Sequence, residues 1–231
     1  MTVALLLNTF KLVMWDARPM TNRSSGDGAA RVADDGAEAV TIRTGGPDDA
    51  GAVAALHADS WRTAYSGIVP EEALGDGLAA ERRELWALRL GVDYGEPANT
   101  PALLIAESGG AEGSGGAEGS AGQVAGRIAG FAYLVPQPDG RILLDNLHVR
   151  PGSTGRGTGR LLMSAALAHT ARQHPGADLY LEVLRDNSRA VAFYERAGGV
   201  RTAEQEGHFP GGFVLPEYEY TWPAPAVGPQ H

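Results

Sequence analysis

The spacing of apolar residues predicts a chain that alternates between helices and strands. Apolar positions recur at helical intervals after Pro47 and mark a helix that runs toward Tyr65. A second helix is expected over residues 70–90, and two more over residues 155–174 and 188–197. The expected apolar stripe of the second helix consists of Leu74, Leu78, Leu85, Trp86 and Leu88.

Runs of aliphatic and β-branched residues predict the strands that lie between these helices. They are expected at residues 40–43, 101–107, 124–135, 141–149, 179–184, 200–206 and 217–222. Pro138, Asp139 and Gly140 form a typical hairpin turn between two of them. This order of elements predicts an α/β domain of the α+β type, with one central sheet and helices on its faces.

The ends of the chain and one internal segment lack this periodicity. Residues 1–38 are expected to be a disordered or mis-annotated extension, since Met14 and Met20 are alternative starts. The domain is expected over residues 39–223, followed by a disordered tail over 224–231. A hexapeptide, Gly-Gly-Ala-Glu-Gly-Ser, occurs twice in tandem and predicts a flexible loop insertion over 108–122.

Composition narrows the possible functions. The 231 residues carry a formal net charge of -9, and Lys11 is the only lysine, so binding of nucleic acid is not expected. Absence of cysteine excludes disulfides, thiolate metal sites and a cysteine nucleophile, and it suits a cytoplasmic protein. No apolar stretch is long enough to span a membrane, and the six histidines show no paired metal-ligand spacing. No metal and no membrane association are therefore expected.

A glycine-rich turn between a predicted strand and a predicted helix is the sharpest feature of the chain. Such a turn allows close approach of the backbone to a ligand, and the N–H groups at a helix start bind phosphate oxygens. A nucleotide-hydrolysing P-loop is disfavoured because Thr158 stands where lysine is required. A dinucleotide-binding fingerprint fails because Arg160 occupies the third glycine position. A turn without any chemistry remains a third reading.

A fourth reading comes from family resemblance. Residues 154–159, Thr-Gly-Arg-Gly-Thr-Gly, resemble the pyrophosphate loop Gln/Arg-x-x-Gly-x-Gly/Ala of the GCN5-related N-acetyltransferase (GNAT) superfamily, with Thr154 departing at the first position. Residues 179–200 resemble the strand–Asn–helix–Phe-Tyr–Gly block of the same superfamily, with Val200 replacing its usual Phe. The resemblance implies a mostly antiparallel sheet of six or seven strands, splayed between the fourth and fifth, with about four flanking helices. It also implies direct transfer of acetyl from acetyl-CoA to a primary amine.

The resemblance assigns roles to individual residues. Tyr194 corresponds to the general acid that protonates the departing thiolate, and Glu182 or Asp145 is the candidate base. Asn187 lies two helical turns before Tyr194 and is expected to contact the cofactor. The remaining expected cofactor-binding residues are Leu147, His148 and Val149 along pantetheine, and Thr154, Gly155, Arg156, Gly157, Thr158, Gly159 and Arg160 at the phosphates. Simple helix capping by Asn187, core packing of Tyr194 and an outward-facing Glu182 remain alternatives.

The acceptor is the least specified part of the prediction. His57, Trp61 and Tyr65 recur every four residues and form either an aromatic wall for an amine or plain core packing. His208 is a further candidate for substrate binding, and residues 60–70 resemble a large bacterial subgroup of the superfamily. A small-molecule amine is the expected acceptor. A protein N-terminal acetyltransferase and a non-catalytic acetyl-CoA-binding module are the alternatives, and a homodimer through the C-terminal strands is plausible.

Overall fold

A computed structural model describes residues 40–109, 127–152, 156–209 and 212–224, together with the backbone of two short strands near the N-terminus. The predicted N-terminal extension, the Gly/Ser/Glu loop and the C-terminal tail lie largely outside these residues, as do Thr154 and Gly155. In the part of the chain that is described, no helix is both long and apolar enough to cross a bilayer.

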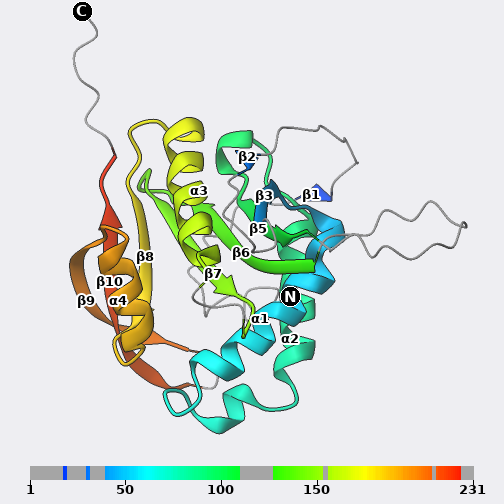
Figure 1. Ribbon diagram of the computed structural model, residues 1–231, viewed down its shortest axis with the longest axis vertical. Helices are drawn as coiled ribbons and strands as arrows, with labels where there is room; N and C mark the ends of the chain where they lie inside the picture. Colours follow the sequence, from blue (N-terminus) through cyan, green and yellow to red (C-terminus); the bar gives the residue numbers. More distant parts are fainter. Residues whose placement is uncertain are drawn as a thin grey trace, which may run out of the picture.

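The helices and strands follow the predicted order (Figure 1). The helices are α1 Ala50–Ala64, α2 Leu78–Gly91, α3 Thr158–Gln173 and α4 Ser188–Arg196, with short 3-10 turns η1 Pro47–Asp49, η2 Glu71–Leu74 and η3 Pro97–Asn99. The strands are β1 Arg18–Pro19, β2 Ala30–Arg31, β3 Val40–Thr44, β4 Val92–Asp93, β5 Ala102–Ser108, β6 Arg127–Pro136, β7 Ile142–Val149, β8 Leu179–Leu184, β9 Val200–His208 and β10 Val214–Trp222.

One sheet organises the domain, in the order β2-β3-β5-β6-β7-β8-β10-β9. All neighbouring strands in it are antiparallel except β7 and β8, which run parallel. Helices α3 and α4 cover one face, and α1 and α2 cover the other (Figure 1). The predicted mixed, mostly antiparallel sheet with four flanking helices is therefore confirmed.

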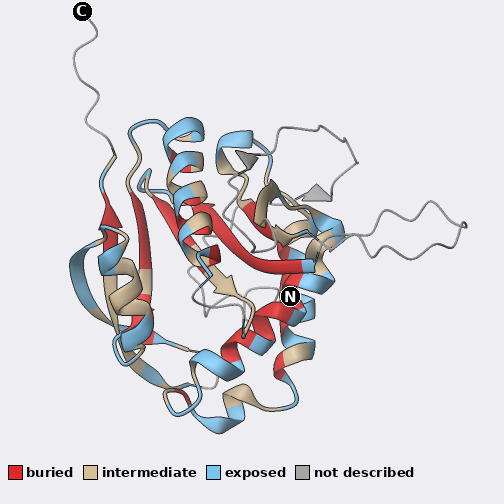
Figure 2. Cartoon of the chain, viewed as in Figure 1, coloured by how far each residue is buried: buried red, intermediate tan, exposed pale blue. Residues whose placement is uncertain are grey.

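The core has two layers because the sheet is covered on both faces (Figure 2). Strand β6 lies in its middle, and its side chains alternate between the layers as the period of a strand requires. Ala132 and Leu134 pack with α3, whereas Phe131 and Tyr133 pack with Trp86 of α2. The long apolar run of β6 is thus explained by burial on both faces.

The sheet opens between β7 and β8. Only two residue pairs join these strands, Ile142 with Leu179 and Leu143 with Tyr180, and pairing ends there. Counted from β3, this is the gap between the fourth and fifth strands, so the predicted splay is confirmed.

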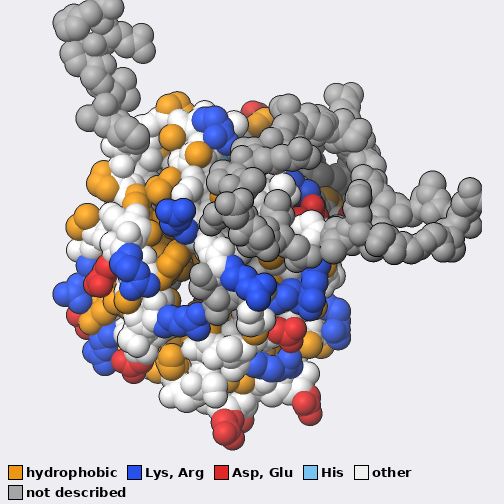
Figure 3. All heavy atoms as spheres, in the orientation of Figure 1, with side chains coloured by type: hydrophobic (Ala, Val, Ile, Leu, Met, Phe, Trp, Pro, Cys, Tyr) orange, Lys and Arg blue, Asp and Glu red, His pale blue; other side chains and the backbone are white. Residues whose placement is uncertain are grey.

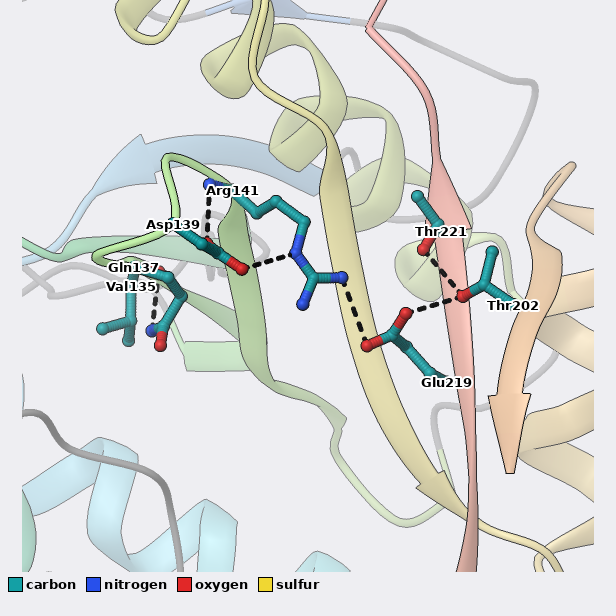
Figure 4. A network of polar contacts seen from close by, with 7 residues as sticks. All are labelled: Val135, Gln137, Asp139, Arg141, Thr202, Glu219 and Thr221. Atoms are coloured by element: carbon teal, nitrogen blue, oxygen red, sulfur yellow. Dashed lines mark hydrogen bonds and ion pairs between the residues drawn. The ribbon is translucent and has the colours of Figure 1, made fainter. Parts of the chain in front are cut away.

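A polar network holds the closed end of this gap (Figure 4). The Arg141 guanidinium, at the start of β7, reaches across β8 and donates to Glu219 of β10 at 3.2 Å. On the way it lies 3.8 Å from the centre of the Tyr180 ring. Glu219 in turn accepts from Thr202 of β9 at 2.7 Å. These contacts tie four strands together on the side where β7 and β8 still pair.

A β-bulge changes the facing of β7 halfway along. Leu144 is opposite Leu134 and Asn146 is opposite Tyr133, so Asp145 is the extra residue. After the bulge, Leu147 and Val149 pack toward α3, and the alternate residue His148 lies against Phe131 on the opposite face. The bulge therefore directs a run of polar side chains toward α1 and α2.

The second predicted helix differs from the observed one in two respects. It is interrupted at residues 75–77, so that η2 and α2 are separate elements. Leu88 is 39% exposed, whereas two arginines, Arg82 and Arg89, occupy the buried stripe with Leu78 and Trp86. The apolar stripe was thus partly wrong, because aromatic rings and a buried carboxylate beneath the helix accommodate guanidinium groups in place of leucines.

Gly130 of β6 is predicted to be indispensable for packing against α3. A Cβ there would lie 2.7 Å from the His148 carbonyl oxygen and 2.9 Å from Leu162 Cδ1, and the backbone oxygen has no room to move. We expect Gly130→Ala to lower the free energy of unfolding by about 1–3 kcal/mol in urea titrations. Gly51→Ala, in α1 with open space around its Cβ position, is the control and should be neutral or stabilising. Equal effects of the two variants would contradict this account.

Candidate active site

A cavity of about 380 Å³ lies where β7 and β8 part. Its lining residues come from α1 and the turn after it, β7, β8, β9 and β10 and the segment between the last two strands. They are Trp61, Tyr65, Val69, Leu143, Leu144, Asp145, Asn146, His148, Glu182, Leu184, Gln205, Glu206, Gly207, His208, Phe209 and Glu217. Six residues singled out in the sequence are among them, namely Trp61, Tyr65, Asp145, His148, Glu182 and His208. The fold thus brings together residues that are more than a hundred positions apart.

Asp145 is held in a buried ion pair. Its carboxylate accepts from Arg89 of α2 at 2.6 Å, and both side chains are almost wholly buried, at 4% and 2% exposed. The side-chain amide of Asn146 donates to the same oxygen at 2.5 Å. The Asp145 carboxylate is therefore already engaged by two donors, one of them a buried cation.

Glu182 is the other predicted base, and its surroundings differ. It lies on β8 facing the cavity, half-buried, and accepts a hydrogen bond at 2.6 Å from the side-chain amide of Gln205 on β9. A neutral amide fixes the direction of the carboxylate without neutralising its charge. Glu182 thus reaches the same cavity as Asp145 from the opposite strand of the splay.

The predicted aromatic stripe of α1 is divided between the core and the cavity. The His57, Trp61 and Tyr65 rings follow one another, with centroids 5.8 Å and 5.0 Å apart. His57 is fully buried, whereas Trp61 and Tyr65 line the cavity. The far side of the Trp61 ring is covered by the Arg82 guanidinium at 4.3 Å. One end of the stripe is therefore core packing and the other is an aromatic wall.

His148 of β7 is part of the cavity wall. Its Nδ1 is 2.8 Å from the Ser60 hydroxyl of α1, and its ring centroid is 4.6 Å from that of His57. Burial lowers the pKa of His148 to about 3, and the positive charge of Arg82 adds to this effect. Burial also holds the pKa of His57 well below its usual value, with smaller contributions from His148, Arg82 and Arg89. Both imidazoles are thus neutral near pH 7.

Tyr194 lies on α4 beside the cavity rather than in its lining. Its ring packs edge-on against Phe193 and Trp222, with centroids 5.2 Å and 6.0 Å away. Burial raises the pKa of the Tyr194 phenol, and the nearby Tyr65 phenol raises it further. Tyr65, which does line the cavity, has its pKa raised to about 12 by burial and by Glu217. The two phenols are therefore close enough to influence each other.

Asn187 caps helix α4. Its side-chain oxygen accepts from the Ala190 backbone N–H at 3.1 Å, which is the structural alternative considered for it. Its side chain also interacts with the Tyr65 hydroxyl, which partly offsets the rise in the pKa of that phenol. Asn187 thus connects the start of α4 to the aromatic wall, and its expected contact with a cofactor stays a prediction.

The start of α3 has the features of a phosphate-binding site. Gly157 caps the helix with a φ of 85°, in the left-handed region that favours glycine. The Leu161 N–H donates to the Gly157 carbonyl at 2.9 Å, which leaves the N–H groups of Thr158, Gly159 and Arg160 in the unpaired first turn of the helix. Thr158 is buried, whereas Arg156 and Arg160, on either side of it, are exposed.

The two motif segments meet in space. A Cβ on Gly159 would lie 3.5 Å from the Phe193 ring and 3.6 Å from Val149, so α3 begins directly beside α4 and the end of β7. Beyond Leu143 no pairing joins β7 to β8, and the edge of β7 that faces the splay includes the predicted pantetheine-contacting residues Leu147, His148 and Val149. An extended ligand that begins at the helix start fits along this edge as an added strand does.

Several site residues were missed in the sequence. Arg89 and Gln205 hold the two candidate carboxylates, and Ser60 holds His148. Each lies on an element remote in sequence from its partner, and only the strand order and the packing of α1 and α2 on the sheet bring them together. Phe209, by contrast, was considered from the sequence along with His208, and it lines the cavity. Among the described residues, no group of three or more His, Asp or Glu side chains is arranged to hold a metal ion.

Comparison with known proteins agrees with this geometry. A sequence model of the Acetyltransferase (GNAT) family matches residues 93–199. The Mycobacterium tuberculosis protein named "Probable N-acetyltransferase Rv2775" is 32% identical over 161 residues, which cover 68% of this chain and 78% of that protein. Streptothricin acetyltransferase of Streptomyces lavendulae is 32% identical over 167 residues, covering 68% of this chain and 79% of that enzyme. The chain belongs to the GNAT family and is an N-acetyltransferase, that is, an acyltransferase.

Solved structures share the fold. The PaiA N-acetyltransferase of Thermoplasma acidophilum, in complex with coenzyme A, superposes with a TM-score of 0.58 at 18% identity, covering 79% of this chain and 99% of that one. YncA of Salmonella typhimurium, solved with acetyl-CoA, gives a TM-score of 0.54 at 14% identity, covering 83% and 98%. Since acetyl-CoA is the acyl donor of the family, it is the co-substrate of this chain, and the start of α3 and the edge of β7 fit it.

The buried histidines predict acid lability. Their pKa values are lowered by folding, so below about pH 6.5 the unfolded chain binds more protons than the folded one, and stability falls as pH falls. Each such group contributes a slope of up to about 1.4 kcal/mol per pH unit. Between pH 6.5 and 4.5, urea titrations give the free energy of unfolding as a function of pH. His57→Gln should reduce the slope of this dependence by the amount that corresponds to the uptake of about one proton on unfolding. His208→Gln, at an exposed position, is the control, and equal slopes for the two variants would contradict the account.

The Asp145–Arg89 pair is predicted to be structural. Asp145→Asn leaves the Arg89 guanidinium buried without its counter-charge and should cost about 3–5 kcal/mol in the free energy of unfolding. The control is Asp139→Asn, whose exposed ion pair with Arg141 is expected to contribute less than about 1 kcal/mol. Unchanged stability of Asp145→Asn together with lost acetyl transfer would instead favour Asp145 as the base.

Proposed function

We propose that this chain acetylates a primary amine of a small molecule that enters the cavity between β7 and β8. The amine nitrogen attacks the thioester carbon of acetyl-CoA, the C–S bond breaks, and no covalent enzyme intermediate forms. Glu182 takes the proton from the amine, directly or through water, and Tyr194 supplies a proton to the departing sulfur. The observation that carries the proposal is the convergence of six residues selected from the sequence on one cavity at the splay of the sheet.

The donor side of the proposal is supported by charge. The chain as a whole is acidic, with a net charge of -9, yet basic side chains gather across the middle of the face that carries α3 (Figure 3). Acidic side chains are fewer across this band, and some lie at the lower rim of the face. Exposed Arg156 and Arg160 flank the first turn of α3, where the backbone N–H groups are available to a pyrophosphate.

Glu182 is favoured over Asp145 as the base because of their different partners. Asp145 is bound to a buried guanidinium, whereas Glu182 accepts a hydrogen bond from a neutral amide, that of Gln205. A carboxylate oriented in this way is able to accept a proton from an ammonium group or from a bridging water.

Burial raises the pKa of the Tyr194 phenol, and this affects the role of Tyr194 as the proposed acid. A phenol in water, with a pKa near 10, is weaker than a thiol with a pKa near 8.5, and burial weakens it further. Burial also raises the pKa of a thiol at the same place, so the pKa values of the phenol and of the leaving thiol shift in the same direction.

The cavity favours a small acceptor. Its volume of about 380 Å³ is in the range of small-molecule sites. Carboxylates and the aromatic Trp61 and Tyr65 rings are groups that attract an ammonium ion. Similarity to streptothricin acetyltransferase over two thirds of the chain supports an acceptor of the aminated antibiotic kind, alongside amino acids and polyamines.

The first test is a thiol-release assay with acetyl-CoA and a panel of amino acids, polyamines, aminated antibiotics and short peptides. Tyr194→Phe and Glu182→Gln should each lower kcat by about 10²–10⁴-fold, because each removes one proton-transfer group. Acetyl-CoA binding measured by calorimetry should stay unchanged.

The matched controls are Tyr218→Phe and Glu204→Gln, whose side chains do not line the cavity and whose turnover should be normal. Release with peptides alone would replace the small-molecule acceptor by a protein N-terminus. Acetyl-CoA binding without release for any amine would overturn the enzyme mechanism in favour of a binding module.

A further inference from the structure

The His148 side chain is absent from the proton transfers proposed above, although it lines the cavity. It reaches this position because the bulge at Asp145 changes the facing of β7, so that its imidazole lies between Phe131 and Ser60. His148 of β7 and Glu182 of β8 thus line the same cavity from the two strands of the splay.

The hydrogen bonds of Ser60 fix where His148 carries its proton. The Ser60 hydroxyl donates to the His57 carbonyl oxygen at 3.0 Å, as serines within helices commonly do. A hydroxyl has one hydrogen, so the 2.8 Å contact with His148 Nδ1 forms at the same time only if Nδ1 is the donor. In a neutral imidazole with Nδ1 protonated, Nε2 carries a lone pair.

The groups behind His148 keep this arrangement neutral. The Trp86 indole donates to His57 Nδ1 at 2.9 Å, so neutral His57 is protonated at Nε2. His57 and the Arg82 guanidinium both lie close to His148 and disfavour a second proton on it. The carboxylates that line the cavity are Asp145, which is bound to Arg89, and Glu182, Glu206 and Glu217 on β8, β9 and β10. His148 Nε2 has no hydrogen-bond partner among the described residues.

We propose that His148 orients the acceptor amine by accepting a hydrogen bond at Nε2 from an N–H of the attacking nitrogen. The proposal rests on the proposed function. In the neutral amine one N–H points to Glu182, which takes that proton as the nitrogen lone pair forms the C–N bond, and a second N–H points to His148, which keeps its neutral state throughout. With two N–H directions fixed by acceptors on opposite strands, the remaining lone pair of the nitrogen is directed at the thioester carbon. Ser60 acts through His148, as the residue that sets its tautomer.

This role predicts a specific pattern of kinetic changes. His148→Phe keeps an aromatic ring but removes the acceptor, and it should lower kcat/KM for the amine by about tenfold to a hundredfold, without changing the KM of acetyl-CoA. Ser60→Ala removes the partner of Nδ1 and should give a smaller loss of the same kind, which Ser60→Thr restores because it retains the hydroxyl. His169→Phe, on α3 and outside the cavity lining, is the control.

The tautomer is measurable without any substrate. Long-range proton–nitrogen correlation spectra of histidine-labelled protein should show the His148 proton on Nδ1 near pH 7, and Ser60→Ala should shift it toward Nε2. Circular dichroism and melting curves of each variant confirm that it is folded, and Ser60→Ala, which removes one oxygen atom, serves if His148→Phe does not fold.

Two results would overturn the orienting role alone. They are a folded His148→Phe variant with kcat/KM for the amine within about twofold of the unaltered protein, and a spectrum with the His148 proton on Nε2. Failure of the unaltered protein to acetylate any amine overturns the proposed function instead, and the role of His148 with it.

Discussion

Parallel pairing between β7 and β8 ends after the pair Leu143–Tyr180, and the rest of the site depends on that early end. If the strands had stayed paired, the edge of β7 would be satisfied by β8, and no cavity would lie between them. Arg141 prevents the opposite outcome, complete separation, because it stacks on Tyr180 and binds Glu219 at the closed end. Since β10 pairs with β8 and β9 with β10, the three strands leave β7 together and form one wall of the cavity.

A second constraint on the site is that two cationic side chains of α2 are buried next to the cavity and do not line it. Arg82 and Arg89 belong to the buried stripe of α2, where charged groups are costly unless paired. Arg89 is balanced by Asp145, and both arginines lie over aromatic rings. Burial keeps the neighbouring imidazoles neutral, with a smaller contribution from these positive charges, while carboxylates such as Glu182 supply the charged groups that face the ligand space.

Much of this architecture was predictable from the sequence because it depends on local patterns. The strand and helix order, the glycine-rich start of α3 and the splay all followed from periodicity and from motif resemblance. What was not predictable depends on contacts between distant elements. The burial of Arg82 is decided by the rings beneath it and the orientation of Glu182 by Gln205, on an element that only the sheet order places nearby. The bulge at Asp145 could not be predicted either, because the pattern of apolar and polar residues over 141–149 does not identify the extra residue.

The bulge also separates two kinds of recognition on a single strand. After it, Leu147 and Val149 face the core beneath α3, and the alternate positions 146 and 148 face the cavity. Under the proposed function the donor is held by the main chain of this strand, which is indifferent to the identity of the side chains. Changes at positions 146 and 148 therefore alter the acceptor wall while leaving the donor contacts in place. In a scaffold of this kind, point substitutions in one strand are enough to change the acceptor, while the binding of acetyl-CoA is retained.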